Sequence, residues 1–332
     1  MATGIVSIAS HLLGLSFIAI VLFWLNITAF VTLWSLNLLR VVFFPRHFLD
    51  DLFDHSRGTG FFTLVAGTSV LGSQFVLIGH DYRTAVVLWF LASFLWLGLV
   101  YTIFTCLIIK ENKPSIAEGI NGGWLTAVVA TQSIAVLSGL LATHFEPYVS
   151  QVLFLALAMW LFGGMLYIWI ISLIFYRYCF FKFSPQDLTP PYWINMGAVA
   201  ISTLSGTILI ANTANFTFFS DILPFLKGFT MFFWATGTWW IPMLIILGIW
   251  RHFYKKVPLT YNPLYWGAVF PLGMYTSATF QLASVSNLSF IIFIPKFFIY
   301  LALLAWLATF GGLLGEIFKN YALRLHSFDW VK

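Results

Sequence analysis

Nine apolar stretches, each long enough to cross a lipid bilayer, constrain this chain more than any other feature of its sequence. A helix needs roughly 20 residues to cross a hydrocarbon core of about 30 Å, and lipid admits only helices and closed barrels as spanning structures. Of the 332 residues, 61% are hydrophobic and 8% are charged, whereas soluble proteins average about 25% charged residues. We therefore predict an all-α integral membrane protein with one transmembrane domain over residues 1–332. The predicted spans cover residues 15–43, 59–79, 84–109, 120–143, 148–176, 191–212, 224–250, 263–284 and 291–318.

The first residues, MATGIVSIAS, are apolar but too few to cross a membrane alone. At 1.5 Å per residue, about ten residues cover half of the hydrocarbon core, and His11 and Gly14 then interrupt the segment. Counting this segment as the first gives ten transmembrane helices, the first truncated at the N-terminus. We expect either that translation begins upstream or that the segment is poorly ordered and a pore that it lines is incomplete.

The basic residues divide unevenly between the two sides that these spans define. Cytoplasmic loops hold an excess of Lys and Arg near span ends. One side has Arg83, Lys227 and Lys296, and the other side, with the C-terminus, has the remaining 13 of the 16. We therefore predict a cytoplasmic C-terminus. Because the net charge of +5 is spread over loop ends, nucleic acid is not an expected partner.

Odd-numbered and even-numbered spans differ in composition. The odd ones are rich in small and hydroxyl residues, and the even ones are bulkier. Polar residues that recur every three or four positions suit one face of a hydrated lumen, although close packing of membrane helices through small residues is the alternative. The alternation predicts five helical hairpins around a central pore, with the odd helices inside. The pore-lining candidates on the third, fifth and seventh spans are Thr63, Gly67, Gln74, Thr126, Ser133, Asn195, Ser202 and Gly206.

The ninth span, in the stretch YNPLYWGAVFPLGMYTSATFQL, is built unlike a lipid-facing helix. Pro271 in its interior leaves the carbonyl of Gly267 without its helical partner, which a membrane tolerates only where protein or a water-filled cavity covers it. One face of this helix is narrow, mildly polar and uncharged, with a single aromatic ring, Phe270. We interpret Phe270 as a plug of the lumen; the alternative is that it packs against a neighbouring helix. The candidates on this span are Gly267, Phe270, Pro271, Met274, Ser277 and Gln281.

Several kinds of chemistry are not indicated. The interiors of the odd spans contain no Asp, Glu, Lys or Arg, so a built-in proton relay of the kind found in coupled transporters is not visible. Cys106 and Cys179 form neither a metal spacing nor a disulfide framework. No catalytic constellation is legible from local spacing, and Gly122–Gly123 is not followed by a phosphate-loop lysine. We expect no enzyme activity, no cofactor and no metal site.

Four stretches together resemble a known family, the tellurite-resistance and C4-dicarboxylate transporters. This family also contains the slow, voltage-dependent anion channels of plant guard cells and yeast malate permeases. The resemblance covers nearly the whole chain, and MATGIVSIA is similar to the middle of the family's first span, whose cytoplasmic half has no counterpart here. The stretches are RGTGFFTLVAGTSVLGSQ, PPYWINMGAVAISTLSGT, FWATGTWWIPMLIILGIWRH and YNPLYWGAVFPLGMYT.

The resemblance implies a pore lined by the odd helices, a homotrimer of independently conducting subunits, and a phenylalanine gate at the position of Phe270. Phe61 and Phe62 fall where the family carries further constricting aromatics. The expected function is that of an anion channel or uniporter for small inorganic or organic anions in a bacterial inner membrane. A proton-coupled transporter of C4-dicarboxylates or tellurite is the alternative.

Overall fold

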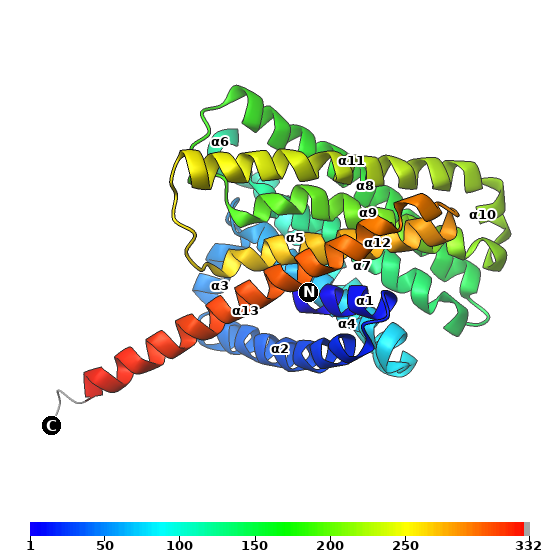
Figure 1. Ribbon diagram of the computed structural model, residues 1–332, viewed down its shortest axis with the longest axis horizontal. Coiled ribbons are helices and arrows are strands. Elements are labelled where there is room, and N and C mark those ends of the chain that lie inside the picture. The colour runs from blue at the N-terminus through cyan, green and yellow to red at the C-terminus, as the bar shows by residue number, and fades with distance from the viewer. Residues whose placement is uncertain (329–332) are drawn as a thin grey trace.

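A computed structural model describes the backbone of residues 1–328 and the side chains of residues 1–321. The described chain is helical and contains no strand (Figure 1). Three helices are short: α3 (Pro45–Leu52), α6 (Ile116–Gly119) and α10 (Thr217–Asp221). The others are α1 (Ala2–Leu12), α2 (Ser16–Phe43), α4 (Phe62–Gln74), α5 (Tyr82–Ile109), α7 (Thr126–Leu141), α8 (Val149–Phe180), α9 (Ile194–Ala211), α11 (Leu223–Ile249), α12 (Trp266–Val285) and α13 (Phe293–Phe328).

Eight of the described helices are long and apolar enough to cross a membrane. They confirm an integral membrane protein built of helices. Helix α1 has 11 residues and is too short to span by itself, although it is a regular helix with most of its side chains buried. Helix α12 has 20 residues and is not among the eight, because its Gly, Ser, Thr and Gln residues lower its mean hydropathy. It nevertheless runs through the bundle between α9 and α13.

Consecutive helices pair as antiparallel hairpins, and the hairpins close into a ring. The pairs α1–α2, α4–α5, α7–α8, α9–α11 and α12–α13 are in contact. Helices α1, α4, α7, α9 and α12 also contact one another in cyclic order, with α12 returning to α1. Burial separates the two layers: 94% of the apolar window is buried in α7 and in α9, against 22% in α2 and in α11. The predicted alternation of inner and outer helices is therefore confirmed.

Polar side chains connect each outer helix to the inner helix of the next hairpin. Most donors are indole N–H groups, which need a partner once they are buried. In four of the six bonds the acceptor is a hydroxyl group of an inner helix, which therefore serves in packing between helices. The bonds are Asn26 Nδ2 to Gln74 Oε1 (2.6 Å), Trp89 Nε1 to Ser138 Oγ (2.7 Å), Trp96 Nε1 to Thr131 Oγ1 (2.8 Å), Trp160 Nε1 to the Ser202 carbonyl (2.8 Å), Trp234 Nε1 to Thr279 Oγ1 (3.1 Å) and Trp306 Nε1 to Thr3 Oγ1 (3.0 Å).

The bond between Trp306 and Thr3 closes the ring, since it joins the last hairpin to the first. Hydrogen bonds between membrane helices contribute about 0.6 kcal/mol on average. We expect Trp306→Phe and Thr3→Val each to lower the free energy of unfolding, and the double variant to show a coupling of about that size in a double-mutant cycle. The control pairs Thr3→Val with Trp239→Phe, because Trp239 is half exposed on an outer helix. If the losses of unfolding free energy in Trp306→Phe and Thr3→Val were strictly additive, the bond between these two side chains would not contribute to stability.

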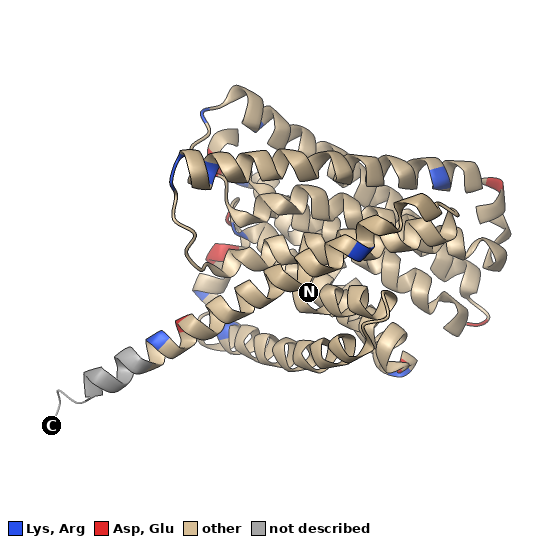
Figure 2. Ribbon diagram, viewed as in Figure 1, with Lys and Arg blue, Asp and Glu red and all other residues tan. Residues whose placement is uncertain are grey.

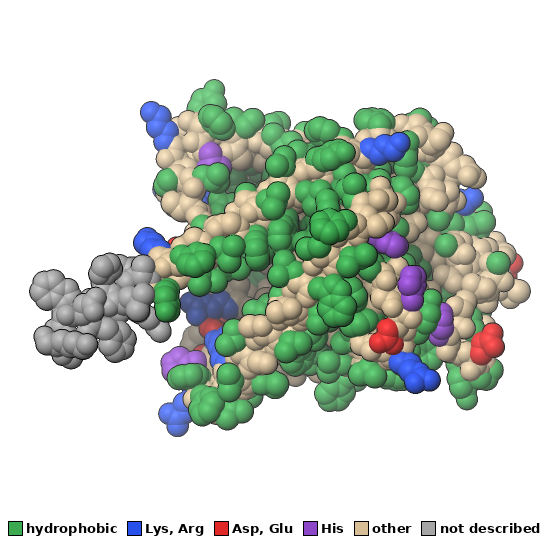
Figure 3. Space-filling model, turned by 60° about the horizontal axis from the view of Figure 1, so that its bottom comes forward, with side chains coloured by type: hydrophobic (Ala, Val, Ile, Leu, Met, Phe, Trp, Pro, Cys, Tyr) green, Lys and Arg blue, Asp and Glu red, His purple; other side chains and the backbone are tan. Residues whose placement is uncertain are grey.

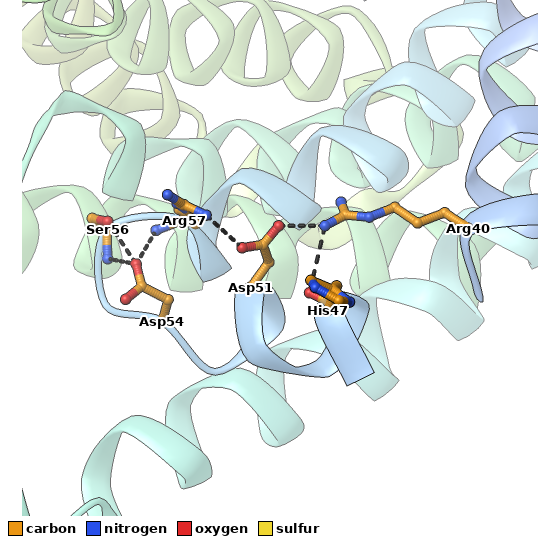
Figure 4. Close-up of polar contacts among 6 residues, drawn as sticks. All are labelled: Arg40, His47, Asp51, Asp54, Ser56 and Arg57. Carbon is orange, nitrogen blue, oxygen red and sulfur yellow. Dashed lines mark hydrogen bonds and ion pairs between the residues drawn. The ribbon is translucent and has the colours of Figure 1, made fainter. Parts of the chain in front are cut away.

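A polar cluster fastens the end of α2 to the start of α4 (Figure 4). The Asp51 carboxylate accepts hydrogen bonds from Arg40, at the end of α2, and from Arg57, 2.8 Å away, just before the 3₁₀ turn η1 (Gly58–Phe61). The guanidinium groups of Arg40 and Arg57 hold the pKa of Asp51 below its usual range. Asp54 accepts from the backbone and side chain of Ser56. This loop is thereby held against the bundle.

Candidate functional site

A narrow cavity lies on the axis of the inner ring, and every inner helix contributes to its wall. Representative lining residues are Ile8 of α1, Val70 of α4, Ser133 of α7, Leu204 of α9 and Met274 of α12. The lining also reaches Leu12, Leu140 and Ile208, near the last turns of their helices. The cavity therefore occupies the half of the ring in which the inner helices end. Its wall is mainly aliphatic and contains no charged side chain.

Phe270 lies just beyond this cavity, toward the start of α12. Met274 and Gln281 line the cavity, and Phe270 precedes them by four and eleven residues, spacings that share one helix face. One helical turn separates Phe270 from Met274, which is about 6 Å along the axis. The Phe270 side chain is completely buried. The face of α12 that lines the cavity thus continues onto this ring.

Pro271 has a specific neighbour across the inner ring. A Cβ atom added to Gly197 of α9 would lie 2.7 Å from Cγ of Pro271, so only glycine allows the two helices to approach this closely. Gly267, one turn earlier, lies near Pro191, with 3.5 Å between its added Cβ position and Cα of Pro191. The start of α12, which carries Phe270, is therefore held against the start of α9.

The structure brings three polar or flexible candidates to the cavity wall, namely Ser133, Met274 and Gln281. Three other candidates contact the outer helices. Gln74 accepts from Asn26 of α2, the Asn195 amide donates to the Tyr178 hydroxyl of α8 at 3.3 Å, and the Ser202 carbonyl accepts from Trp160.

The remaining candidates lie at several other places. Gly206 faces α8 and α11, because an added Cβ would lie 3.0 Å from Trp160 and 2.1 Å from Thr230 Oγ1. Phe61 packs edge-on against Phe48 of α3, with ring centroids 5.0 Å apart. Phe62 packs at a tilt against Phe104 of α5, with ring centroids 6.0 Å apart. The hydroxyls of Thr63, Thr126 and Ser277 donate to backbone carbonyls of Gly60, Gly123 and Gly273. An added Cβ at Gly67 would lie 4.0 Å from the backbone nitrogen of Met1, where α1 begins.

The aliphatic residues of the cavity wall were not among the predicted pore-lining residues, because the prediction was based on polar residues that recur on one helix face. Ile201, Leu204 and Ile208 recur at helical spacing on α9 and all line the cavity. Their side chains are branched and apolar, like those of any membrane helix, so composition alone did not distinguish them. The signal available in the sequence was their shared spacing within a span that is otherwise rich in small residues.

The inner helices run parallel to one another, since each opens a hairpin (Figure 1). Except for α1, which begins beside Gly67 within α4, the inner helices therefore start at one end of the ring, where helix dipoles place partial positive charge. Four of them begin with a 3₁₀ turn that contains Gly or Pro: η1, η3 (Gly122–Leu125), η5 (Pro190–Trp193) and η8 (Pro263–Tyr265). Figure 2 shows most Lys and Arg residues at this same end. Basic residues and helix N-termini together make this the more positive end of the ring.

The arrangement defines a class of protein. A ring of membrane helices around a narrow, uncharged lumen, with positive potential at one mouth and an aromatic ring on the cavity face, suits the passage of anions by weak contacts at several sites. Within the described residues, no group of three or more His, Cys, Asp or Glu side chains is placed to hold a metal ion.

Comparison with known proteins gives the family. Residues 1–314 match the voltage-dependent anion channel (SLAC1) family. An uncharacterized membrane protein of Mycobacterium tuberculosis is 37% identical over 152 residues, which are 46% of this chain and 77% of that protein. An uncharacterized transporter of Methanocaldococcus jannaschii is 26% identical over 97% of this chain and 93% of its own length. The sulfite efflux pump SSU1 of Trichophyton rubrum is 25% identical over 94% of this chain and 87% of its own length.

This chain belongs to the voltage-dependent anion channel family, because the match extends over almost its whole length. Its general function is accordingly the transport of anions across a membrane, and the predicted family resemblance is confirmed.

Proposed function

We propose that this protein conducts small anions passively through the axis of its inner ring, and that Phe270 closes the lumen. The observation that carries the proposal is the cavity to which all inner helices contribute, with Phe270 on the same face of α12 as Met274 and Gln281. A buried aromatic ring in a narrow apolar lumen excludes water and so blocks ions by dewetting. The lining offers no charged group that would hold an anion firmly.

The alternative, proton-coupled uptake of dicarboxylates or tellurite, requires groups that titrate along the path. The cavity wall contains none. Histidines lie instead on the surface at both ends of the molecule (Figure 3), and one of them, His144, stacks on Tyr82 with ring centroids 3.7 Å apart. Passive conduction is therefore the better-supported mode.

Reversal potentials in planar bilayers separate the two modes. For passive conduction we expect shifts with an anion gradient and none with a pH gradient across the bilayer, whereas coupled transport gives shifts with pH. Replacing chloride in turn by nitrate, sulfite, malate and tellurite then ranks the permeant anions. Sulfite is included because a full-length relative bears the name of a sulfite efflux pump. Absence of any anion current would reject the proposed function.

We propose that the end of the ring rich in basic residues, with the C-terminus, faces the cytoplasm of a bacterial cell. The support is the excess of Lys and Arg at that end (Figure 2). Accessibility tags placed in the loop 44–58 and at the C-terminus should then report the cytoplasm, and a tag in the loop 212–223 the opposite side. A cytoplasmic signal from the loop 212–223 would contradict this topology.

We also propose that the protein forms a homotrimer, as its family resemblance implies. Large apolar side chains cover the outer helices, such as Phe94 and Phe17, which are mostly exposed in the single chain. This surface suits contact with lipid and with neighbouring subunits alike. Mass measurement of the complex extracted in mild detergent tests the number of subunits.

A further inference from the structure

A second pocket lies outside the inner ring, between the end of α11 and the turn that precedes α9. Its wall includes Thr189 and Trp193 on one side and Gly248, Arg251 and His252 on the other, with Tyr265 at its edge. The pocket is open to its surroundings, and about 360 Å³ of space free of protein atoms lies within it and at its mouth. That space accommodates a compact polar group.

Arg251 makes this pocket cationic. One Nη atom of Arg251 donates to the carbonyl of Leu188, which fixes the guanidinium at the pocket wall. Among the side chains that the structure describes, no carboxylate lies within 4.0 Å of Arg251, in contrast to Arg40, Arg57 and Arg177, which all contact an aspartate. A partly buried guanidinium without an acidic partner favours an anionic ligand, since a planar fork of N–H donors matches phosphate and carboxylate oxygens.

His252 adds a second donor beside Arg251. Its Nδ1 atom lies 2.8 Å from the carbonyl of Val257, so that bond orients the imidazole and leaves Nε2 for another partner. Lys255 and Lys256 follow three and four residues after His252, and their exposed side chains add positive charge near this end of α11. The pocket therefore has two basic side chains, Arg251 and His252, and no acidic side chain in its wall.

The surroundings of the pocket indicate which anion reaches it. Arg251 and His252 lie in a π-helical turn, η7 (Trp250–Tyr254), and such turns occur frequently at functional sites. Phe253 and Tyr254 in the same turn are 77% and 79% exposed. Exposed aromatic rings at the end of a spanning helix, next to Lys and Arg, are typical of the depth at which lipid headgroups lie.

We propose that this pocket binds a phosphate group, and specifically the headgroup phosphate of an anionic lipid in the adjoining leaflet. Arg251 and His252 hold the phosphate oxygens, while Phe253 and Tyr254 contact the lipid beside it. The occupied pocket would connect α11 to the turns that start α9 and α12, because Pro190 and Tyr265 belong to its wall. The proposal concerns binding and does not depend on anion conduction through the ring.

The test measures lipid binding to the purified full-length chain. Native mass spectrometry is used to titrate the protein with phosphatidylglycerol and, as a neutral reference, with phosphatidylcholine. We expect preferential retention of phosphatidylglycerol, and an apparent Kd that rises about tenfold or more in Arg251→Gln, which removes a charge-assisted hydrogen bond. The matched control is Arg46→Gln, an exposed arginine at the same end of the molecule, which should bind as the wild type does.

A second variant blocks the pocket and keeps Arg251. This matters because the bond from Arg251 to the Leu188 carbonyl also holds the segment that precedes α9. Gly248 lies in the pocket wall, and an added Cβ there meets no atom within 4 Å, so Gly248→Leu fills the space and leaves the fold intact. Gly228→Leu is its control, because Gly228 has the same open surroundings at the other end of α11. Only Gly248→Leu should lose the lipid.

Inorganic phosphate distinguishes a lipid site from a site for a soluble anion. If phosphate at millimolar concentration raises the melting temperature of the wild type but not of Gly248→Leu, and phosphatidylglycerol does not compete with it, the lipid assignment is wrong. Equal retention of phosphatidylglycerol by the wild type, Arg251→Gln and Gly248→Leu would overturn the site altogether. Since no readout involves current, failure here is separate from failure of the proposed conduction.

Discussion

The variant Phe270→Ala should carry a much larger anion current than the wild type, roughly tenfold or more, because removal of the ring opens a hydrophobic constriction to water. Its melting temperature in detergent should change little, because a ring that plugs a lumen contributes less to packing than one inside a core. Phe270→Leu should conduct at an intermediate level, since leucine still fills part of the lumen. Single-channel recording and thermal melting on the same preparation provide both quantities.

Phe233→Ala is the matched control for this experiment. Phe233 is as completely buried as Phe270, but it lies between the outer helices, with ring centroids 4.5 Å from Phe229 and 6.0 Å from Trp160. Truncation of such a core residue costs about 3–5 kcal/mol of stability and should leave conductance unchanged. If Phe270→Ala behaved in the same way, with a large drop in melting temperature and no added current, Phe270 would be an ordinary core residue and not a gate.

The second large effect is expected at Arg177, a cation that is buried at the end of α8. Its guanidinium donates to the carbonyl of Ile120 at 2.8 Å and to the Tyr192 hydroxyl, and it lies 3.5 Å from the Asp187 carboxylate. It also lies over the Phe183 ring, 5.6 Å from the centroid. One side chain thus connects α8 to the segments that lead into two inner helices, α7 and α9.

Arg177→Met should lower the free energy of unfolding by about 3 kcal/mol, because it leaves buried acceptors without partners at a cost of about 1–3 kcal/mol each. Arg177→Lys should recover less than half of this loss, since an ammonium group cannot reproduce the planar fork of donors. Arg46→Met is the control, because a substitution at an exposed position usually changes the free energy of unfolding by no more than about 0.5 kcal/mol. Unfolding in mixed micelles measures the free energies. Equal stability of Arg177→Met and Arg46→Met would show that the buried contacts contribute nothing.

The helical class and the hairpin order followed from the sequence, and eight of the nine predicted spans are helices long and apolar enough to cross a membrane. Lipid provides no hydrogen-bond partners for the backbone, so an apolar stretch of about 20 residues must be helical, and short loops between such stretches force antiparallel neighbours. The alternation of small and bulky spans correctly separated inner from outer helices, as the burial of α7 and α9 and the exposure of α2 and α11 show. The family motifs also depend only on local sequence.

Which face of each inner helix borders the lumen was decided by the tertiary structure. Gln74 and Ser202 bond to outer helices, while Ile8 and Leu204 line the cavity. The physical reason is that an inner membrane helix is buried on every side, so its polarity pattern does not contain the single solvent face that identifies the orientation of a helix in a soluble protein. Hydroxyl and amide groups then turn toward whichever neighbour provides a hydrogen-bond partner. That partner can be far away in the chain: Thr3 bonds to Trp306, 303 residues later, and only the closed ring brings the two together.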